Sequence, residues 1–271
     1  MRRKYTFQQF IDLLRGKKRY GPLYPEHSQL TLDLCNVRNR IRGESDPIIR
    51  SFLKYSLSFG AISSSQILQD SFVQWVLNEK KNGFFCEFGA TDGVSLSNSY
   101  SLEQHFAWTG ICAEPGVTWH ADLRRNRPGA TIETRCVWSS TGEQLTFSET
   151  SDRELSGLTQ FHKSRFYTQS RKRAQTYMVE TISLNDLLKT HNAPKDLDYL
   201  SIDTEGSELN IIKAFDMNLF QPKIITVEHN FGSNRQKIYD LLTSFGYRRV
   251  LPEISLFDDW YISSKIELPT A

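Results

Sequence analysis

Short apolar runs alternate with amphipathic stretches along the chain from residue 84 onward. The apolar runs have strand length, and they cover residues 84–88, 110–114, 130–137, 197–202 and 224–228. Apolar residues recur at helical spacing in the stretches Leu96 to Ala107, Trp119 to Asn126, Leu184 to Lys189, Glu208 to Phe215 and Arg235 to Phe245. Strands that alternate with helices in this way predict a doubly wound α/β fold with a mostly parallel sheet.

Two segments depart from this rhythm. Tyr247 to Leu251 and Trp260 to Ile262 are two short strand-like runs without a helix between them, which predicts an antiparallel C-terminal hairpin and a seven-stranded sheet. Residues 148–177 form a long polar insertion. Insertions of this length are usually lids or disordered loops, and we expect one of these here.

The chain before the first strand has a different composition, and we divide the protein into a basic helical extension, residues 1–64, and a main domain, residues 65–271. Apolar residues at helical spacing predict a helix from Thr6 to Arg15, and Asp46 followed by a proline predicts the start of another. Phe59 to Ser65 contains a glycine and three consecutive serines, and it is the best linker in the sequence.

The stretch Phe84 to Gly93 reads FFCEFGATDG and has the pattern of a strand that passes into a ligand-holding turn. Gly89 and Gly93 remove side chains that would keep a ligand away from the backbone. A second strand ends in Glu114, which follows Gly93 by 21 residues, the spacing at which a carboxylate receives the ribose hydroxyls of a nucleoside. The two features together predict a site for an adenosine-containing cofactor.

The composition of this turn distinguishes between two candidate cofactors. Between Gly89 and Gly93 it carries Thr91 and Asp92 and no lysine, an environment that would repel a pyrophosphate and accept a sulfonium. S-adenosylmethionine therefore fits better than NAD. The residues predicted to line its site, with the last two near adenine, are Glu87, Gly89, Ala90, Thr91, Asn98, Glu114, Cys136 and Val137.

Polar residues also end the strands at 197–202 and 224–228. Asp203, Glu228 and His229 would meet at one edge of a parallel sheet, where they could hold Mg²⁺, Mn²⁺ or Fe²⁺ and acidify a hydroxyl. Asp203 and His229 are the predicted catalytic residues, with Glu205 as a reserve base. In the alternative interpretation Glu228 caps the next helix, His229 forms a local hydrogen bond and Asp203 orients the cofactor. Arg127, on the helix after the Glu114 strand, is expected to face water.

Four of these segments resemble the motifs of the FkbM family. They are EFGATDG at 87–93, WTGICAEP at 108–115, IDTEGSE at 202–208 and VEH at 227–229. The resemblance covers Phe84 to Ile262 and implies a class I, Rossmann-like, S-adenosylmethionine-dependent O-methyltransferase. It also implies an acceptor among sugars or polyketides. We expect a sugar hydroxyl of a nucleotide sugar or glycan, and hence a role in polysaccharide biosynthesis.

Charge and composition restrict the classes of acceptor and binding partner. Residues 1–60 contain twelve Lys or Arg against five Asp or Glu, whereas the whole chain has a net charge of +2. This basic part suits a phosphate-bearing or acidic acceptor, and it leaves open homo-oligomer formation or an RNA-docking surface. Nucleic acid is disfavoured because the aromatic and Gly/Arg interleaving of nucleic-acid tracts is absent. A cofactor-binding interaction module without catalysis is a further alternative.

Cysteine spacing and hydropathy bear on the compartment. The four cysteines form no Cys-x-x-Cys pair, and three fall in predicted core strands, so we expect reduced packing residues. The apolar runs are too short for a membrane span, and no signal-peptide core follows the basic start. A cytoplasmic location is the default expectation.

Overall fold

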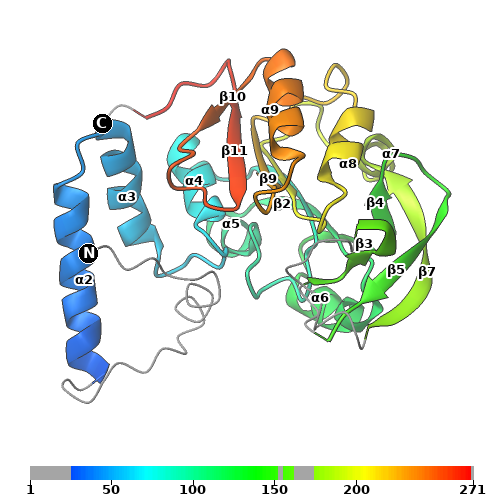
Figure 1. Cartoon of the computed structure of the whole chain (residues 1–271), viewed down its shortest axis with the longest axis horizontal. Helices are drawn as coiled ribbons and strands as arrows, with labels where there is room; N and C mark the ends of the chain where they lie inside the picture. Colours follow the sequence, from blue (N-terminus) through cyan, green and yellow to red (C-terminus); the bar gives the residue numbers. More distant parts are fainter. Residues whose placement is uncertain (1–25, 152–154, 162–173, 270–271) are drawn as a thin grey trace.

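The computed structural model describes residues 26–151, 155–161 and 174–269 (Figure 1). The helix expected at Thr6 to Arg15 and part of the 148–177 insertion lie outside these ranges. No helix within the described ranges is long and apolar enough to cross a membrane. All four cysteines are unpaired, and the three in strands are buried, as expected for packing residues.

A seven-stranded main sheet forms the centre of the protein, as the sequence predicts. Its order is β10-β11-β9-β8-β1-β2-β3. The strands are β1 (Phe84–Phe88), β2 (Thr109–Ala113), β3 (Thr131–Glu133), β8 (Tyr199–Ile202), β9 (Ile224–Glu228), β10 (Tyr247–Val250) and β11 (Asp258–Ser263). Only β11 runs antiparallel to its neighbours, and it pairs with β9 on one side and β10 on the other. The predicted C-terminal hairpin is therefore confirmed.

Helices cover both faces of the main sheet, which is the doubly wound arrangement (Figure 1). They are α4 (Gln69–Val76), α5 (Tyr100–Phe106), α6 (His120–Asn126), α7 (Leu184–Thr190), α8 (Glu208–Ala214) and α9 (Arg235–Ser244). Helix α5 begins four residues later than the apolar spacing predicts. The reason is that Ser97, Asn98 and Ser99 bind the Glu87 carboxylate instead of forming a helical turn.

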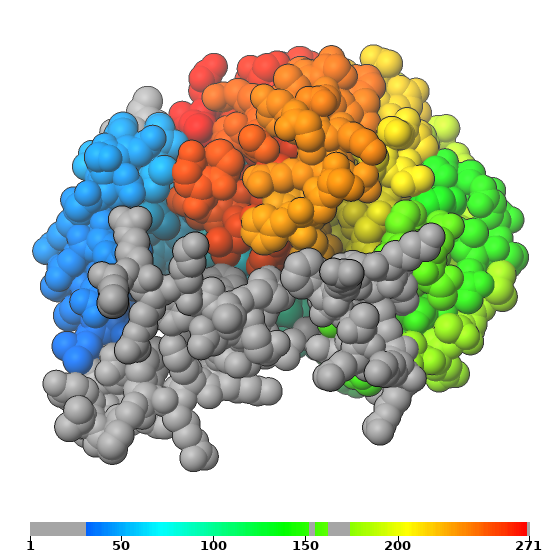
Figure 2. Space-filling model, viewed as in Figure 1, coloured from blue at the N-terminus to red at the C-terminus, as the bar shows by residue number. Residues whose placement is uncertain are grey.

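A second sheet, with the order β4-β7-β5-β6, stands at one end of the molecule (Figure 1). Its strands are β4 (Cys136–Trp138), β5 (Gln144–Glu149), β6 (Gly157–Leu158) and β7 (Gln175–Ser183). The green residues of this sheet lie against the yellow α7–α8 region in the space-filling view (Figure 2). One expectation was therefore wrong, because the 130–137 run is split between two sheets. The described part of the insertion contributes β6 and the start of β7 to the second sheet.

The split has a local cause at Glu133. Its carboxylate accepts hydrogen bonds from the backbone N–H groups of Thr134 and Arg135, both at 3.0 Å, and the Arg135 guanidinium binds it as well. These bonds turn the chain out of the main sheet after β3. They also hold the pKa of Glu133 down at about 2, despite burial that acts in the opposite direction.

Side chains alternate between two apolar cores, one on each face of the main sheet. Within β1, Phe85 belongs to the core beneath α4, whereas the adjacent Cys86 belongs to the core beneath α7, α8 and α9. Residues that follow one another in a strand point to opposite faces, so a sheet buried on both faces needs continuous apolar runs. This requirement explains why the strands of this protein can be recognised in the sequence.

Two N-terminal helices, α2 (Glu26–Arg42) and α3 (Pro47–Phe59), complete the described fold. Asp46 caps α3, and its carboxylate accepts hydrogen bonds from the N–H groups of Ile48 and Ile49 at 2.8 and 3.1 Å. The fully buried Phe52 packs edge-on against the rings of Trp75 and Trp260. Phe52 is thus a fully buried aromatic contact between helix α3 and the main sheet.

Replacement of Phe52 tests this attachment. Phe52→Ala removes a fully buried ring and is expected to lower the free energy of unfolding by about 3–5 kcal/mol. Leu57→Ala on the same helix removes a side chain that is 48% exposed and should change it by less than about 0.5–1 kcal/mol. Urea denaturation measures both variants. Equal losses would show that Phe52 does not anchor the helix.

Candidate active site

The carboxyl ends of β1, β2 and β8 lie together at the point where the order of the main sheet reverses. After β1 the chain continues to β2 on one side, whereas β8 pairs with β1 on the other. Such a switch point is the usual ligand site of an open α/β sheet. A pocket opens here with an empty volume of about 420 Å³, including its mouth. It is lined by Phe88, Gly89, Ala113, Glu114, Pro115, Cys136, Val137, Phe147, Ser156, Gly157, Leu158, Asp203, Thr204 and Ser207.

The turn after β1 fits the pocket only with glycine at position 89. Gly89 has a φ of +70°, and a Cβ atom there would lie 2.3 Å from the backbone oxygen of Asp203. Its N–H donates to the carbonyl oxygen of Ala113 at 3.0 Å. The turn is therefore pressed between the ends of β2 and β8. Thr91 also takes the left-handed conformation, with a φ of 47°.

Glu114 closes β2 and is almost completely buried. Its Oε2 accepts the N–H of Thr91 at 3.0 Å, and its Oε1 accepts the N–H of Gly116 at 2.6 Å. Burial raises the pKa of Glu114 to about 7, although these two backbone donors act in the opposite direction. Each carboxylate oxygen keeps a second lone pair for a ligand hydroxyl.

Four of the eight predicted cofactor residues line the pocket: Gly89, Glu114, Cys136 and Val137. The other four, Glu87, Ala90, Thr91 and Asn98, are not among its lining residues. Asn98 donates its backbone N–H to Glu87 at 2.6 Å and its side-chain amide to Ser201 at 2.9 Å. In this structure these four residues shape the turn around the pocket.

Arg127 was expected to face water, and that expectation was wrong because the residue is fully buried. Its Nε lies 2.6 Å from a carboxylate oxygen of Glu103, and Nη1 lies 3.7 Å from Glu87. It also donates to the hydroxyl groups of Ser97 and Ser99 at 3.1 and 2.9 Å. The guanidinium fixes the segment that follows the glycine turn.

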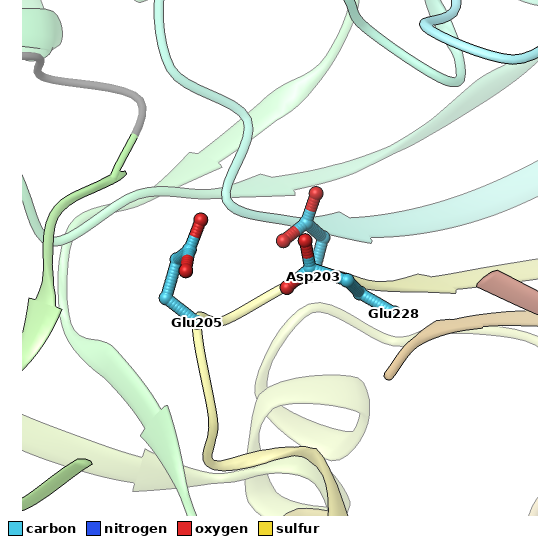
Figure 3. Close-up of side chains that lie close together, drawn as sticks. All are labelled: Asp203, Glu205 and Glu228. Atoms are coloured by element: carbon cyan, nitrogen blue, oxygen red, sulfur yellow. The ribbon is translucent and has the colours of Figure 1, made fainter. Parts of the chain in front are cut away.

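An acidic cluster adjoins the pocket through Asp203. It consists of Asp203, Glu205 and Glu228, whose carboxylate oxygens lie within 4.8 Å of one another (Figure 3). Burial raises the pKa of Asp203 to about 7, the charge on Glu208 adds to this, and a hydrogen bond with Glu228 acts in the opposite direction. Burial and the neighbouring Asp203 raise the pKa of Glu228 well above its ordinary value. Burial therefore favours the protonated forms of both carboxyl groups, which titrate as an interacting pair.

Glu208 holds the loop that carries this cluster. Its carboxylate accepts hydrogen bonds from the N–H groups of Thr204 and Gly206 at 3.1 and 2.8 Å and from the Thr204 hydroxyl at 3.0 Å. These bonds close a tight turn in which Glu205 has a φ of 58°. The turn directs Glu205 toward the other two carboxylates.

His229 is not part of the cluster that the structure brings together, so the predicted ligand set needs correction. Its Nδ1 accepts the N–H of Phe231 at 3.0 Å, and its Nε2 lies 3.7 Å from Asp259. Burial lowers the pKa of His229, and the imidazole is neutral with its proton on Nε2. Adjacent residues in an extended segment point to opposite sides, so Glu228 and His229 cannot face the same ion. Glu205 takes the place expected for the histidine.

The sequence did not indicate the pocket residues from the second sheet: Phe147, Ser156, Gly157 and Leu158. A weak signal existed, because apolar residues alternate at Leu145 and Phe147 as in a half-buried strand. That pattern gives no information on where the strand packs. Contact with the acidic loop is close, since a Cβ atom on Gly157 would lie 3.2 Å from the Cβ of Glu205.

A mostly parallel sheet with an antiparallel hairpin, a glycine turn after its first strand and a carboxylate closing its second defines the class I methyltransferase fold. The methyltransferase FkbM domain matches residues 87–249, more than half of the chain, and the chain belongs to this family. It is thus an S-adenosylmethionine-dependent methyltransferase. The pocket suits this cofactor, because Glu114 offers acceptors for ribose hydroxyls and Asp203 of the acidic cluster lies in the pocket wall.

Solved structures of other methyltransferases are similar to this chain at low sequence identity. An O-methyltransferase from Bacillus cereus in complex with SAH is 12% identical, with 81% of this chain and 90% of that chain covered and a TM-score of 0.40. A precorrin-6y C5,15-methyltransferase from Geobacter metallireducens is 13% identical, with 71% and 85% covered and a TM-score of 0.40. An SAH-bound methyltransferase of Podospora anserina is 12% identical, with 90% and 99% covered and a TM-score of 0.37. A comparison with curated protein sequences found no match.

Substitution of Glu114 tests the ribose contact. Glu114→Ala should weaken binding of S-adenosylhomocysteine by about 1.5–3 kcal/mol, the scale of hydrogen bonds to a charged group. Glu114→Gln, which keeps the shape, should fall between this variant and the wild type. Isothermal titration calorimetry measures all three, with the exposed Glu253→Ala as control. Unchanged affinity in Glu114→Ala would place the ribose elsewhere.

The acidic cluster predicts a pH effect on stability without ligand. The folded pKa of Asp203 is about 7, above its ordinary value of 3.8, so the folded chain keeps a proton that the unfolded chain releases. This contribution to stability is present below about pH 4 and is lost as the pH rises toward 7. Asp203→Asn should therefore gain stability relative to wild type between pH 4 and 7 in urea denaturation. A constant difference across this range would contradict the assignment.

Proposed function

We propose that the protein is an O-methyltransferase that acts on a sugar hydroxyl of a nucleotide sugar or glycan. The observation that carries this proposal is the position of Asp203, which belongs both to the cofactor pocket and to the acidic cluster. A neutral hydroxyl is a poor nucleophile and must lose its proton during transfer. Carboxylates beside the reactive end of a cofactor site suit that requirement.

The bound cofactor supplies an electrophilic methyl group, which passes to the acceptor oxygen as its bond to sulfur breaks. The chain must then accept the hydroxyl proton. Burial raises the pKa values of Asp203 and Glu228, that of Asp203 to about 7, so this pair of carboxyl groups can take up the proton. A base with a pKa near the working pH is the most effective in such a transfer.

A divalent cation is the alternative means of activation at the same residues. Asp203, Glu205 and Glu228 offer oxygen ligands only, a set that suits Mg²⁺ or Mn²⁺ better than Fe²⁺. Such an ion would lower the pKa of a bound hydroxyl and would relieve the repulsion among the three carboxylates. We propose it as an assistant to the reaction, with His229 outside the ligand set.

The acceptor class rests on the sequence. Its motifs resemble the FkbM family, whose members often modify sugars and polyketides, and residues 1–60 carry twelve Lys or Arg against five Asp or Glu. A basic surface favours a phosphate-bearing or acidic acceptor. The proposal therefore places the enzyme in polysaccharide biosynthesis and sets RNA below nucleotide sugars as a substrate.

Methyl transfer from radiolabelled cofactor tests the proposal on a panel of nucleotide sugars, acidic polysaccharides and RNA. Product formed only with the sugars is the expected result, and Asp203→Asn or Glu228→Gln should lower the rate at saturating cofactor by about 10²-fold or more. Both variants should still bind S-adenosylhomocysteine. Label in RNA and in no sugar would reject the acceptor class.

The role of a cation is tested separately with chelator. If an ion assists, EDTA should stop turnover, Mg²⁺ or Mn²⁺ should restore it, and Glu205→Gln should weaken the dependence on added ion. His229→Gln should retain that dependence, because the imidazole lies outside the cluster. Full activity in a metal-free, chelator-treated enzyme would leave the Asp203–Glu228 pair as the base.

A further inference from the structure

We propose that a cross-strand pair in the second sheet, Phe147 and Tyr177, forms and positions the adenosine end of the cofactor pocket. In this arrangement Phe147 is the wall against the purine, and Tyr177 holds the turn that carries Glu114. The proposal concerns only the cofactor of the family and is independent of the acceptor class proposed above.

The wall is visible in the lining of the pocket. Phe147 on β5 and Leu158 on β6 face the same hollow as Cys136 and Val137, beside the Glu114 carboxylate. Phe147 and Leu158 are only 3% and 2% exposed, so their positions are fixed by packing. A flat apolar surface next to a ribose-binding carboxylate is what a purine ring requires.

The tether runs through the hydroxyl of Tyr177. It accepts the N–H of Val117 at 3.0 Å and donates to Oε2 of Glu149 at 3.2 Å. The other oxygen of Glu149 accepts the hydroxyl of Thr118. Val117 and Thr118 follow Glu114 within four residues. Hydrogen bonds to the second sheet therefore hold the turn next to the carboxylate that is expected to bind ribose. Burial raises the pKa of Tyr177 to about 12, which keeps this hydroxyl protonated as a donor.

Wall and tether belong to one structural unit. Phe147 and Tyr177 are directly opposite each other in the antiparallel pairing of β5 and β7, and their ring centroids are 5.7 Å apart. A change in either ring is therefore transmitted to the other. The same sheet also packs against the acidic loop, because a Cβ atom on Gly157 of β6 would lie 3.2 Å from the Cβ of Glu205.

The test measures binding of two probes, S-adenosylhomocysteine and adenosine, by calorimetry. Tyr177→Phe should weaken both about two- to tenfold, the scale of one hydrogen bond, and Phe147→Ala should weaken both by about tenfold or more. The two probes should lose affinity by the same factor, because both contain the adenosine half.

Matched controls separate positioning from general damage. Tyr247 lies on β10, at the opposite edge of the main sheet from β3, and its buried hydroxyl donates to the carbonyl oxygen of Pro222 at 2.7 Å. Tyr247→Phe removes this hydroxyl. It should lower the melting temperature as much as Tyr177→Phe does and leave both affinities intact. Phe147→Leu replaces Phe147→Ala if the latter does not fold, and its loss should be smaller.

Two results would overturn the inference. The first is wild-type affinity for both probes in folded Tyr177→Phe and Phe147→Leu. The second is a loss confined to S-adenosylhomocysteine, which would move the effect to the amino-acid end of the ligand. Neither result depends on turnover, so both can be distinguished from a failure of the methyl-transfer assay.

Discussion

The buried guanidinium of Arg127 is the interaction on which the cofactor side of this fold depends. It is enclosed by the carboxylates of Glu87 and Glu103 and by the hydroxyls of Ser97 and Ser99. A charge removed from water is tolerated only when each of its donors is satisfied, and loss of one partner typically costs about 3–5 kcal/mol. This network makes the segment after β1 rigid, so the pocket is formed before any ligand arrives.

Two buried acids of the cluster beside the pocket, in contrast to Arg127, lack oppositely charged partners among the described residues. Asp203 and Glu228 have no basic partner among the ion pairs of the described residues, and the nearby Asp258 receives only the amide of Gln69 at 2.9 Å. Burial without a compensating cation favours their protonated forms. A cationic ligand beside them reverses that preference, and its binding is therefore coupled to proton release. Arg127 gives the site its shape, and these acids give it sensitivity to charge.

The sequence predicted the features that depend on local order along the chain. Apolar runs located the strands of the main sheet, and Gly89 and Glu114 identified the two turns that meet in the pocket. It could not predict contacts made by side-chain direction and tertiary packing. His229 follows Glu228 directly, yet it points to the other side of the chain, and Arg127 looks like a surface residue in the sequence although it is buried.

Strand β11 has a further consequence for how the molecule is assembled. It lies between β9 and β10 and pairs with both, although it follows both in the sequence. During synthesis β9 and β10 therefore exist for a time with unpaired backbone edges, a state prone to association with other chains. Trp260, fully buried against Phe52 and Phe72, enters with β11. The main sheet can therefore close, and α3 can pack against Trp260, only after β11 has been added.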